Sequence, residues 1–223
     1  FERRYDSLPK ENKESIDSVV NFSKQYGNLA TFYGFGLRKI QDKKRLTKLS
    51  KEIFGKRLNR TPLVLHFGSK KHFSDIDLFV ISNEIPPSYD FWLDVRAYKP
   101  HDVNEGIKFL NPMITDPLMI GNLVFGDEEY FKDLKQKVLA QPITEEAISY
   151  SLEKFRFHRR RASDDSLGAY LQGKNLRSSK TYLTSALSLK NGNKVLTFNG
   201  LVDYAQKRFS HDEKFIELKG GIE

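Results

Sequence analysis

Two acidic residues stand where an apolar strand is expected to begin. Asp75 and Asp77 run directly into Leu78–Ile81 within the stretch LVLHFGSKKHFSDIDLFVI (63–81). Acidic residues are disfavoured in strands, and burying an ionised carboxylate without a partner is costly. Because side chains alternate along a strand, both carboxylates point to one face, with Cα atoms roughly 6.5–7 Å apart. Both can therefore reach one or two hard cations, which would relieve their repulsion.

A third carboxylate lies in the next predicted strand, residues 91–98. The alternation FWLDVRAY places Asp94, Arg96 and Tyr98 on one face and Leu93, Val95 and Ala97 on the other. If this strand neighbours the preceding one, Asp94 faces the other two carboxylates across about 5 Å of interstrand spacing. The three acids then predict a metal site. A structural Ca²⁺ or Mg²⁺ site remains an alternative to a catalytic one.

The elements that position these acids follow from periodicity and turn residues. We expect strands at Leu63–Phe67, 75–82 and 91–98, with a loop at 83–89 that contains Pro86-Pro87. Thr144, followed by two glutamates, predicts a helix N-cap. The expected helices are 9–26, one or two within 37–54, 102–110, 116–121, 128–139, one beginning after Thr144, 167–176, 178–189 and 198–209.

The elements group into three predicted units. Residues 1–60 read as a helical N-terminal extension, 61–141 as a mixed α/β catalytic domain, and 142–223 as an α-helical C-terminal domain. The predicted fold class is thus α/β (α+β): a small mixed sheet flanked by helices, followed by a helical bundle.

The overall composition favours some classes of binding partner and excludes some kinds of site. With Lys+Arg 37 against Asp+Glu 29, the 223-residue chain carries a net charge of +8, which favours anionic partners. The absence of cysteine excludes disulfides and thiolate metal sites. No apolar run approaches ~18 residues, so we expect a cytoplasmic protein with no membrane span. The basic runs, such as residues 158–161, are either solvated helix faces or RNA contacts.

Taken together, Gly68-Ser69, Asp75-Ile76-Asp77 and Asp94, each at a strand end, resemble the DNA polymerase β-like nucleotidyltransferase superfamily. The likeness is greatest to its small members with an α-helical C-terminal domain, and it covers roughly residues 61–140 well. It implies the nucleotidyltransferase fold, with Mg²⁺ or Mn²⁺ as cofactor and a nucleoside triphosphate as substrate.

The resemblance also implies roles for individual residues. Asp75, Asp77 and Asp94 would be the catalytic and metal-binding residues, with Asp94 helping to remove the acceptor's proton. The nucleotide would be bound by Gly68, Ser69, Lys70 and, from the C-terminal helices, Lys180. The chain departs from the family in one respect, because only residues 70–74 separate Ser69 from Asp75. Lys70 and its neighbours would either compensate with positive charge or form a polar surface turn.

We therefore expect a metal-dependent nucleotidyltransferase that moves an NMP, with AMP from ATP as the first choice, onto a hydroxyl. The acceptor would be RNA such as tRNA, a protein or a small molecule, and the basic charge favours RNA or protein over a polycationic antibiotic. A protein partner is also expected. The alternative is a catalytically inactive module of the same fold that binds nucleotide, RNA or a partner protein.

Overall fold

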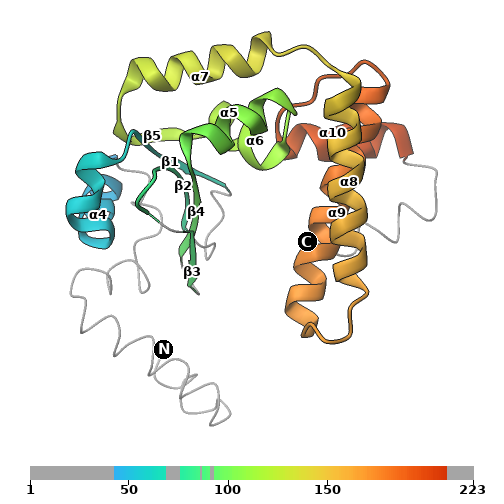
Figure 1. The fold of residues 1–223 in the computed structure, drawn as a ribbon, viewed down its shortest axis with the longest axis horizontal. Helices are drawn as coiled ribbons and strands as arrows, with labels where there is room; N and C mark the ends of the chain where they lie inside the picture. Colours follow the sequence, from blue (N-terminus) through green and yellow to red (C-terminus); the bar gives the residue numbers. More distant parts are fainter. Residues whose placement is uncertain (1–42, 69–75, 86, 91–92, 210–223) are drawn as a thin grey trace, which may run out of the picture.

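A five-stranded mixed sheet lies at the centre of the fold (Figure 1). The computed structural model describes residues 43–68, 76–85, 87–90 and 93–209. The strand order is β3-β4-β2-β1-β5. The strands are β1 (Leu63–Phe67), β2 (Ile76–Ile81), β3 (Ser88–Asp90), β4 (Leu93–Tyr98) and β5 (Asn122–Gly126). β2 and β4 pair in parallel and the other neighbours pair antiparallel, so the predicted mixed α/β class is confirmed.

Each face of the sheet is covered by its own set of helices. On one face, Leu46 and Phe54 of α4 (Lys43–Phe54) and Leu58 of η3 (Gly55–Arg60) pack on inward-facing strand residues such as Leu78 and Val80. This part of the predicted N-terminal extension thus contributes to the sheet's core. The predicted helix 9–26 lies outside the described residues.

The opposite face packs against three helices and carries the candidate acids. These helices are α5 (Pro100–Lys108), α6 (Pro112–Ile120) and α7 (Glu128–Ala140). Their apolar side chains join Leu65, Phe67 and Phe79 of the sheet in a second buried cluster. Because Asp77 lies in register beside Phe67 and two residues before Phe79, its side chain belongs to this face.

Three helices form the C-terminal part and lie together at one side of the sheet (Figure 1). They are α8 (Glu145–Ala162), α9 (Ala169–Lys190) and α10 (Phe198–Phe209). The predicted N-cap is confirmed, since the side chain of Thr144 accepts a hydrogen bond from the N–H of Ala147 at 3.2 Å. No helix within the described ranges is long and apolar enough to cross a membrane.

Three local predictions were wrong. Residues 167–176 and 178–189 form one helix, α9, because the Ser179 hydroxyl donates back to the carbonyl of Leu176 instead of capping a new helix. The short strand β3 overlaps the end of the predicted loop 83–89, continues to Asp90 and pairs with β4. The helix that was predicted over residues 116–121 is α6, which begins earlier, at Pro112. Asn111 caps it, and proline suits the first helical position.

Candidate active site

Asp77 and Asp94 are direct neighbours on adjacent strands. The parallel pairing of β2 with β4 places the two residues in register, so their side chains leave the same face about 5 Å apart at the backbone. Each side chain is only 13% exposed. Two carboxylates this close and this sheltered repel each other, and the site needs positive charge between them.

Arg96 supplies that charge. Its Nε donates to Oδ2 of Asp94 at 3.0 Å, and its Nη2 donates to Oδ1 of Asp77 at 3.3 Å. The guanidinium also lies over the ring of Phe67, with Cζ 4.8 Å from the ring centroid. The alternation of residues 91–98 had already placed Arg96 on the face of Asp94, but no local signal indicated that its side chain bridges to a second strand.

Gly68 brings the backbone against the carboxylate of Asp77. Its φ of +92° lies in the region that favours glycine, and a Cβ at this position would come within 2.1 Å of Oδ2 of Asp77. The chain therefore turns tightly at the end of β1 with its backbone packed on the candidate ligand. The expected approach of the Gly68 backbone to a nucleotide stays a prediction.

Of the remaining predicted site residues, three lie outside the described ranges: Asp75, Ser69 and Lys70. Lys180 lies in the middle of α9, where burial lowers the pKa of its ammonium group and nearby Arg159 adds to the effect. The structure thus brings together Gly68, Asp77 and Asp94, and their roles stay predictions.

The donor chemistry of this site fits a divalent cation. Two register-paired carboxylates offer hard oxygen ligands, which Mg²⁺ and Mn²⁺ prefer. Among the described residues no group of three His, Cys, Asp or Glu side chains is close enough to hold a metal. The third predicted carboxylate ligand, Asp75, lies outside the described residues.

A further carboxylate, that of Asp116 on α6, is buried behind the site. Its Oδ1 accepts a hydrogen bond from the N–H of Phe198 at 2.7 Å, which satisfies a free donor at the start of α10. Burial raises the pKa of the Asp116 carboxyl, while the Phe198 hydrogen bond and the charge of Arg96 act in the opposite direction. Asp116 thus ties α10 to α6.

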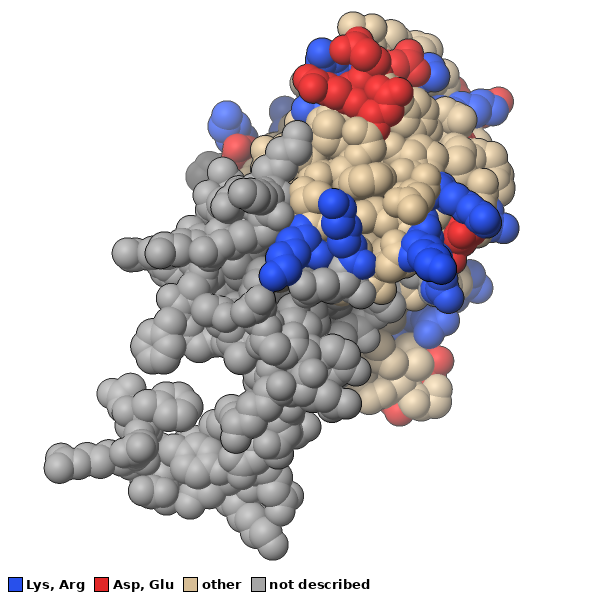
Figure 2. Space-filling model, turned by 90° about the vertical axis from the view of Figure 1, so that its left-hand side faces the viewer, with Lys and Arg blue, Asp and Glu red and all other residues tan. Residues whose placement is uncertain are grey.

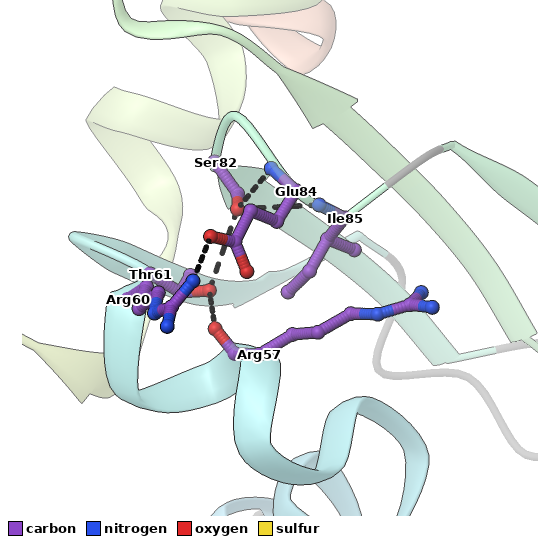
Figure 3. Close-up of polar contacts among 6 residues, drawn as sticks. All are labelled: Arg57, Arg60, Thr61, Ser82, Glu84 and Ile85. Atoms are coloured by element: carbon purple, nitrogen blue, oxygen red, sulfur yellow. Dashed lines mark hydrogen bonds and ion pairs between the residues drawn. The ribbon is translucent and has the colours of Figure 1, made fainter.

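An open pocket of about 700 Å³ lies at the other end of β2 and β4. Figure 3 shows part of its wall, where the Ser82 hydroxyl accepts hydrogen bonds from the N–H groups of Glu84 and Ile85, and Arg60 pairs with Glu84. Ser82 follows Asp77 by five residues, so the pocket is roughly 16 Å away along the strand. We place the candidate site at the carboxylates, since the pocket lacks such a constellation.

Basic side chains form two exposed surfaces. Figure 2, which views the side that carries α4, shows Lys and Arg grouped apart from an acidic group. Among the side chains of α4 and η3 whose exposure the structure describes, the exposed cations are Lys48, Lys51, Lys56, Arg57 and Arg60. The second surface is the end of α8 with the facing part of α9, and we call it the basic hairpin; its exposed members are Arg156, Arg159, Arg160, Arg161, Lys174 and Arg177.

The basic hairpin differs from other charged surfaces of the protein. On α7, Lys132 and Lys137 are neutralised by acids one helical turn away. Within the described part of the chain, Arg156, Arg159 and Arg160 form no ion pair. The hairpin also exposes an aromatic ring, because Phe157 is 44% exposed and has the guanidinium of Arg161 5.7 Å from its centroid.

Comparison with known proteins adds little. No family model matches the chain, and no curated protein matches it. Among solved structures, it is similar to a nucleotidyltransferase-like protein from Exiguobacterium sibiricum 255-15, with 15% sequence identity and a TM-score of 0.36 over 75% of this chain and 68% of the other. A likeness this weak transfers neither fold nor function.

Proposed function

We propose that this protein is a metal-dependent nucleotidyltransferase that moves an NMP, with AMP from ATP as the first choice, onto a hydroxyl group. The observation that carries the proposal is the register pairing of Asp77 with Asp94 beside the tight turn at Gly68. A pair of sheltered carboxylates on adjacent parallel strands suits phosphoryl chemistry, where bound cations neutralise charge on the attacking and leaving oxygens.

Each residue of the site has a defined task in this proposal. Asp77 and Asp94 hold the cation, and Asp94 also accepts the proton of the acceptor hydroxyl. Gly68 lets the backbone approach the triphosphate, since glycine carries no side chain. The predicted ligands Asp75, Ser69 and Lys70 complete the site from the segment that follows, and Lys180 contacts the outer phosphates.

RNA is the acceptor that the surface favours. The arginines of the basic hairpin that form no ion pair with described residues suit a phosphate backbone, and the exposed ring of Phe157 beside Arg161 suits stacking on an unpaired base. A protein acceptor or a small molecule would need no such surface. Aminoglycosides, as polycations, would be repelled by it.

A second candidate function rests on Arg96. Its guanidinium pairs with both Asp77 and Asp94, so a bound cation is not the only group that can offset their charge. The same fold could therefore serve as a catalytically inactive module that binds nucleotide, RNA or a partner protein. Such a module would bind a nucleotide without transferring an NMP. If the acids instead formed a purely structural metal site, metal would raise thermal stability without affecting nucleotide binding.

Label transfer tests the activity. The protein is incubated with each α-labelled NTP, Mg²⁺ and total RNA or lysate, and the labelled species are identified. We expect Asp77→Asn and Asp94→Asn each to lower transfer roughly 10²–10⁴-fold. Asp203→Asn on the exposed face of α10 is the matched control and should transfer normally. Transfer that survives both site substitutions, or no transfer with any NTP, contradicts the proposal.

Charge reversal tests the acceptor. The double substitution Arg159→Glu with Arg160→Glu should weaken RNA binding and make the plot of log affinity against log salt shallower, by about one for each phosphate that the protein no longer neutralises. The control, Lys132→Glu with Lys137→Glu on α7, makes the same change in charge on the neutralised surface. Equal effects of the two pairs would show that only net charge matters and that the hairpin is no docking surface.

A further inference from the structure

The open pocket at the far end of β2 and β4 has a floor that the sheet itself holds. Ser82 is 3% exposed, and its N–H donates to the carbonyl of Tyr98 at 2.9 Å, which continues the pairing of β2 with β4. The Ser82 hydroxyl accepts from the N–H groups of Glu84 at 3.1 Å and Ile85 at 3.3 Å (Figure 3). The loop after β2 is thus folded back onto a fixed hydroxyl, which gives the pocket a defined shape.

The two acids that line the pocket both have partners. Oε1 of Glu84 pairs with Nη1 of Arg60 at 2.9 Å. Asp102 contacts Nε2 of His101 at 2.9 Å through one oxygen, and its other oxygen accepts from the backbone N–H of Lys99 at 3.2 Å. The acids are therefore engaged at the rim, and neither pairs with the side-chain cations of the pocket.

Two cations that line the pocket form no ion pair within the described part of the chain. They are Arg57 of η3 and Lys99, which follows β4, and both side chains are exposed. Figure 3 shows the Arg57 side chain extended past Ile85, with its guanidinium turned away from the Arg60–Glu84 pair. A guanidinium and an ammonium group suit a phosphate, which arginine binds through two hydrogen bonds at once.

The rest of the wall suits a ring. Ile85, which is 6% exposed, belongs to the buried cluster under α4, Ala97 packs against that cluster, and Pro87 adds an exposed apolar surface. Asn83, exposed at the rim, offers an amide that both donates and accepts hydrogen bonds. The volume of about 700 Å³ lies within the range of small-molecule sites.

We propose that this pocket is a second ligand site that binds a nucleotide, with the phosphate at Arg57 and Lys99 and the base against Ile85 and Pro87. A nucleotide combines a phosphate with a flat ring whose edge carries donors and acceptors, and each part has a counterpart in the wall. The pocket lies roughly 16 Å from Asp77 along the strand, so it is separate from the candidate catalytic carboxylates. The inference goes beyond the proposed function and does not depend on it.

The same chemistry is offered by two sources, a free mononucleotide and an unpaired nucleotide of an RNA. Lys51 and Lys56, on the same α4–η3 surface as Arg57, are exposed and form no ion pair with described residues. An RNA that left one base in the pocket would gain their charge along its backbone, whereas a mononucleotide is too short to do so. Chain length and salt dependence therefore distinguish the sources.

Calorimetry on the full chain tests the site. Each ribonucleoside 5′-monophosphate, its nucleoside, ribose 5-phosphate and a single-stranded oligoribonucleotide are titrated in EDTA, which removes divalent cations from the carboxylates. At least one monophosphate should bind roughly tenfold more tightly than its nucleoside and ribose 5-phosphate, since each of these lacks half of the ligand. Tighter, salt-sensitive binding of the oligonucleotide would identify RNA as the source, and equal or weaker binding a free nucleotide. If no probe binds at about 1 mM, or if monophosphate and nucleoside bind equally, the inference is wrong.

Two variants disturb the pocket in different ways. Arg57→Met with Lys99→Met removes both cations, and Asn83→Trp fills the pocket from its exposed rim without a change in charge. Each should weaken binding of the tightest probe roughly tenfold or more. Two variants are used so that a folding defect in one, seen by circular dichroism, leaves the other.

Two further double substitutions serve as controls. Arg208→Met with Lys190→Met removes the same charge from exposed positions on α10 and α9 and should bind like wild type. A loss equal to that of the pocket pair would show that only net charge matters and would overturn the inference. Asp77→Asn with Asp94→Asn should also leave the affinity unchanged. If it abolishes binding while the pocket variants keep it, the ligand lies at the carboxylates, so the inference is wrong and the proposed function stands.

Discussion

Gly68 packs so closely on Asp77 that residue 68 has no room for a side chain. A Cβ there would come within 2.1 Å of Oδ2 and 2.9 Å of Cγ of Asp77, and the backbone φ of +92° disfavours any other residue. The end of β1 and the Asp77 carboxylate of β2 are thus packed against each other. The pairing of Phe67 with Asp77 holds them in place.

Replacing Gly68 by alanine should therefore damage both stability and the site. We expect a loss of about 1–3 kcal/mol from backbone strain, together with displacement of the Asp77 carboxylate. Urea unfolding and Mn²⁺ affinity measure the two effects. Gly173→Ala in α9, where an added Cβ meets nothing within 4 Å, is the control and should be neutral or stabilising. A Gly68→Ala protein as stable as that control would contradict the packing described.

Asn111 connects the sheet domain to helices α8 and α9. Its Oδ1 caps α6 through the N–H of Met113 and accepts from the buried Tyr182 hydroxyl, while its Nδ2 donates to the hydroxyl of Tyr150. Asn111→Ala should cost about 2–4 kcal/mol in unfolding free energy, since it removes a cap and leaves a buried hydroxyl unpaired.

The exposed Asn193 provides the comparison for this test. Asn193→Ala removes one surface hydrogen bond, to the carbonyl of Asn191, and should change stability by less than about 0.5 kcal/mol. Denaturant titration of both variants gives the two values. Equal losses would show that the bonds of Asn111 to the two tyrosines contribute nothing to the attachment of the helices.

Asp116 should make stability depend on pH in an unusual direction for an acid. Burial raises the pKa of its carboxyl in the folded protein above the ordinary 3.8, so the folded state keeps this proton to a higher pH than the unfolded state does. Its contribution to stability is therefore complete below pH 3.8 and is lost as the pH rises through the raised pKa.

Asp116→Asn removes that dependence while keeping an oxygen that can accept from the N–H of Phe198. The unfolding free energy of the variant relative to wild type should rise as the pH increases from about 3 to 7. Urea titrations across this range measure it. A difference that stays flat across this range would show that burial does not raise the pKa of the Asp116 carboxyl.

Lys180 is the remaining predicted contact to the triphosphate. If its ammonium group binds the outer phosphates, Lys180→Ala should raise the KM for the NTP roughly 10–100-fold, as expected when a charge-assisted hydrogen bond is removed. Steady-state transfer kinetics measure it. Lys190→Ala, at the exposed end of the same helix, is the control. An unchanged KM would show that Lys180 does not contact the triphosphate. The roles proposed for Asp77 and Asp94 would not be affected by that result.

The fold was predictable where the signal is local. Strict alternation marked residues 91–98, and the N-cap of Thr144 and the helix Phe198–Phe209 followed from side-chain type and spacing. The sequence did not predict that two expected helices form the single helix α9. Serine, which often caps a helix, can also donate a hydrogen bond to a backbone carbonyl inside a continuous helix, as Ser179 does. β3 was missed because so short a strand depends on its partner β4 and has little pattern of its own.

The sequence by itself determined that acids stand on strands beside a glycine turn, because residue type and the alternation of side chains are local properties. Only the tertiary structure decided that β2 and β4 are neighbours in register, which makes a pair of Asp77 and Asp94. It also decided that Arg96 lies between them. Strand pairing and the path of a long side chain depend on contacts between distant residues, and no local pattern records them.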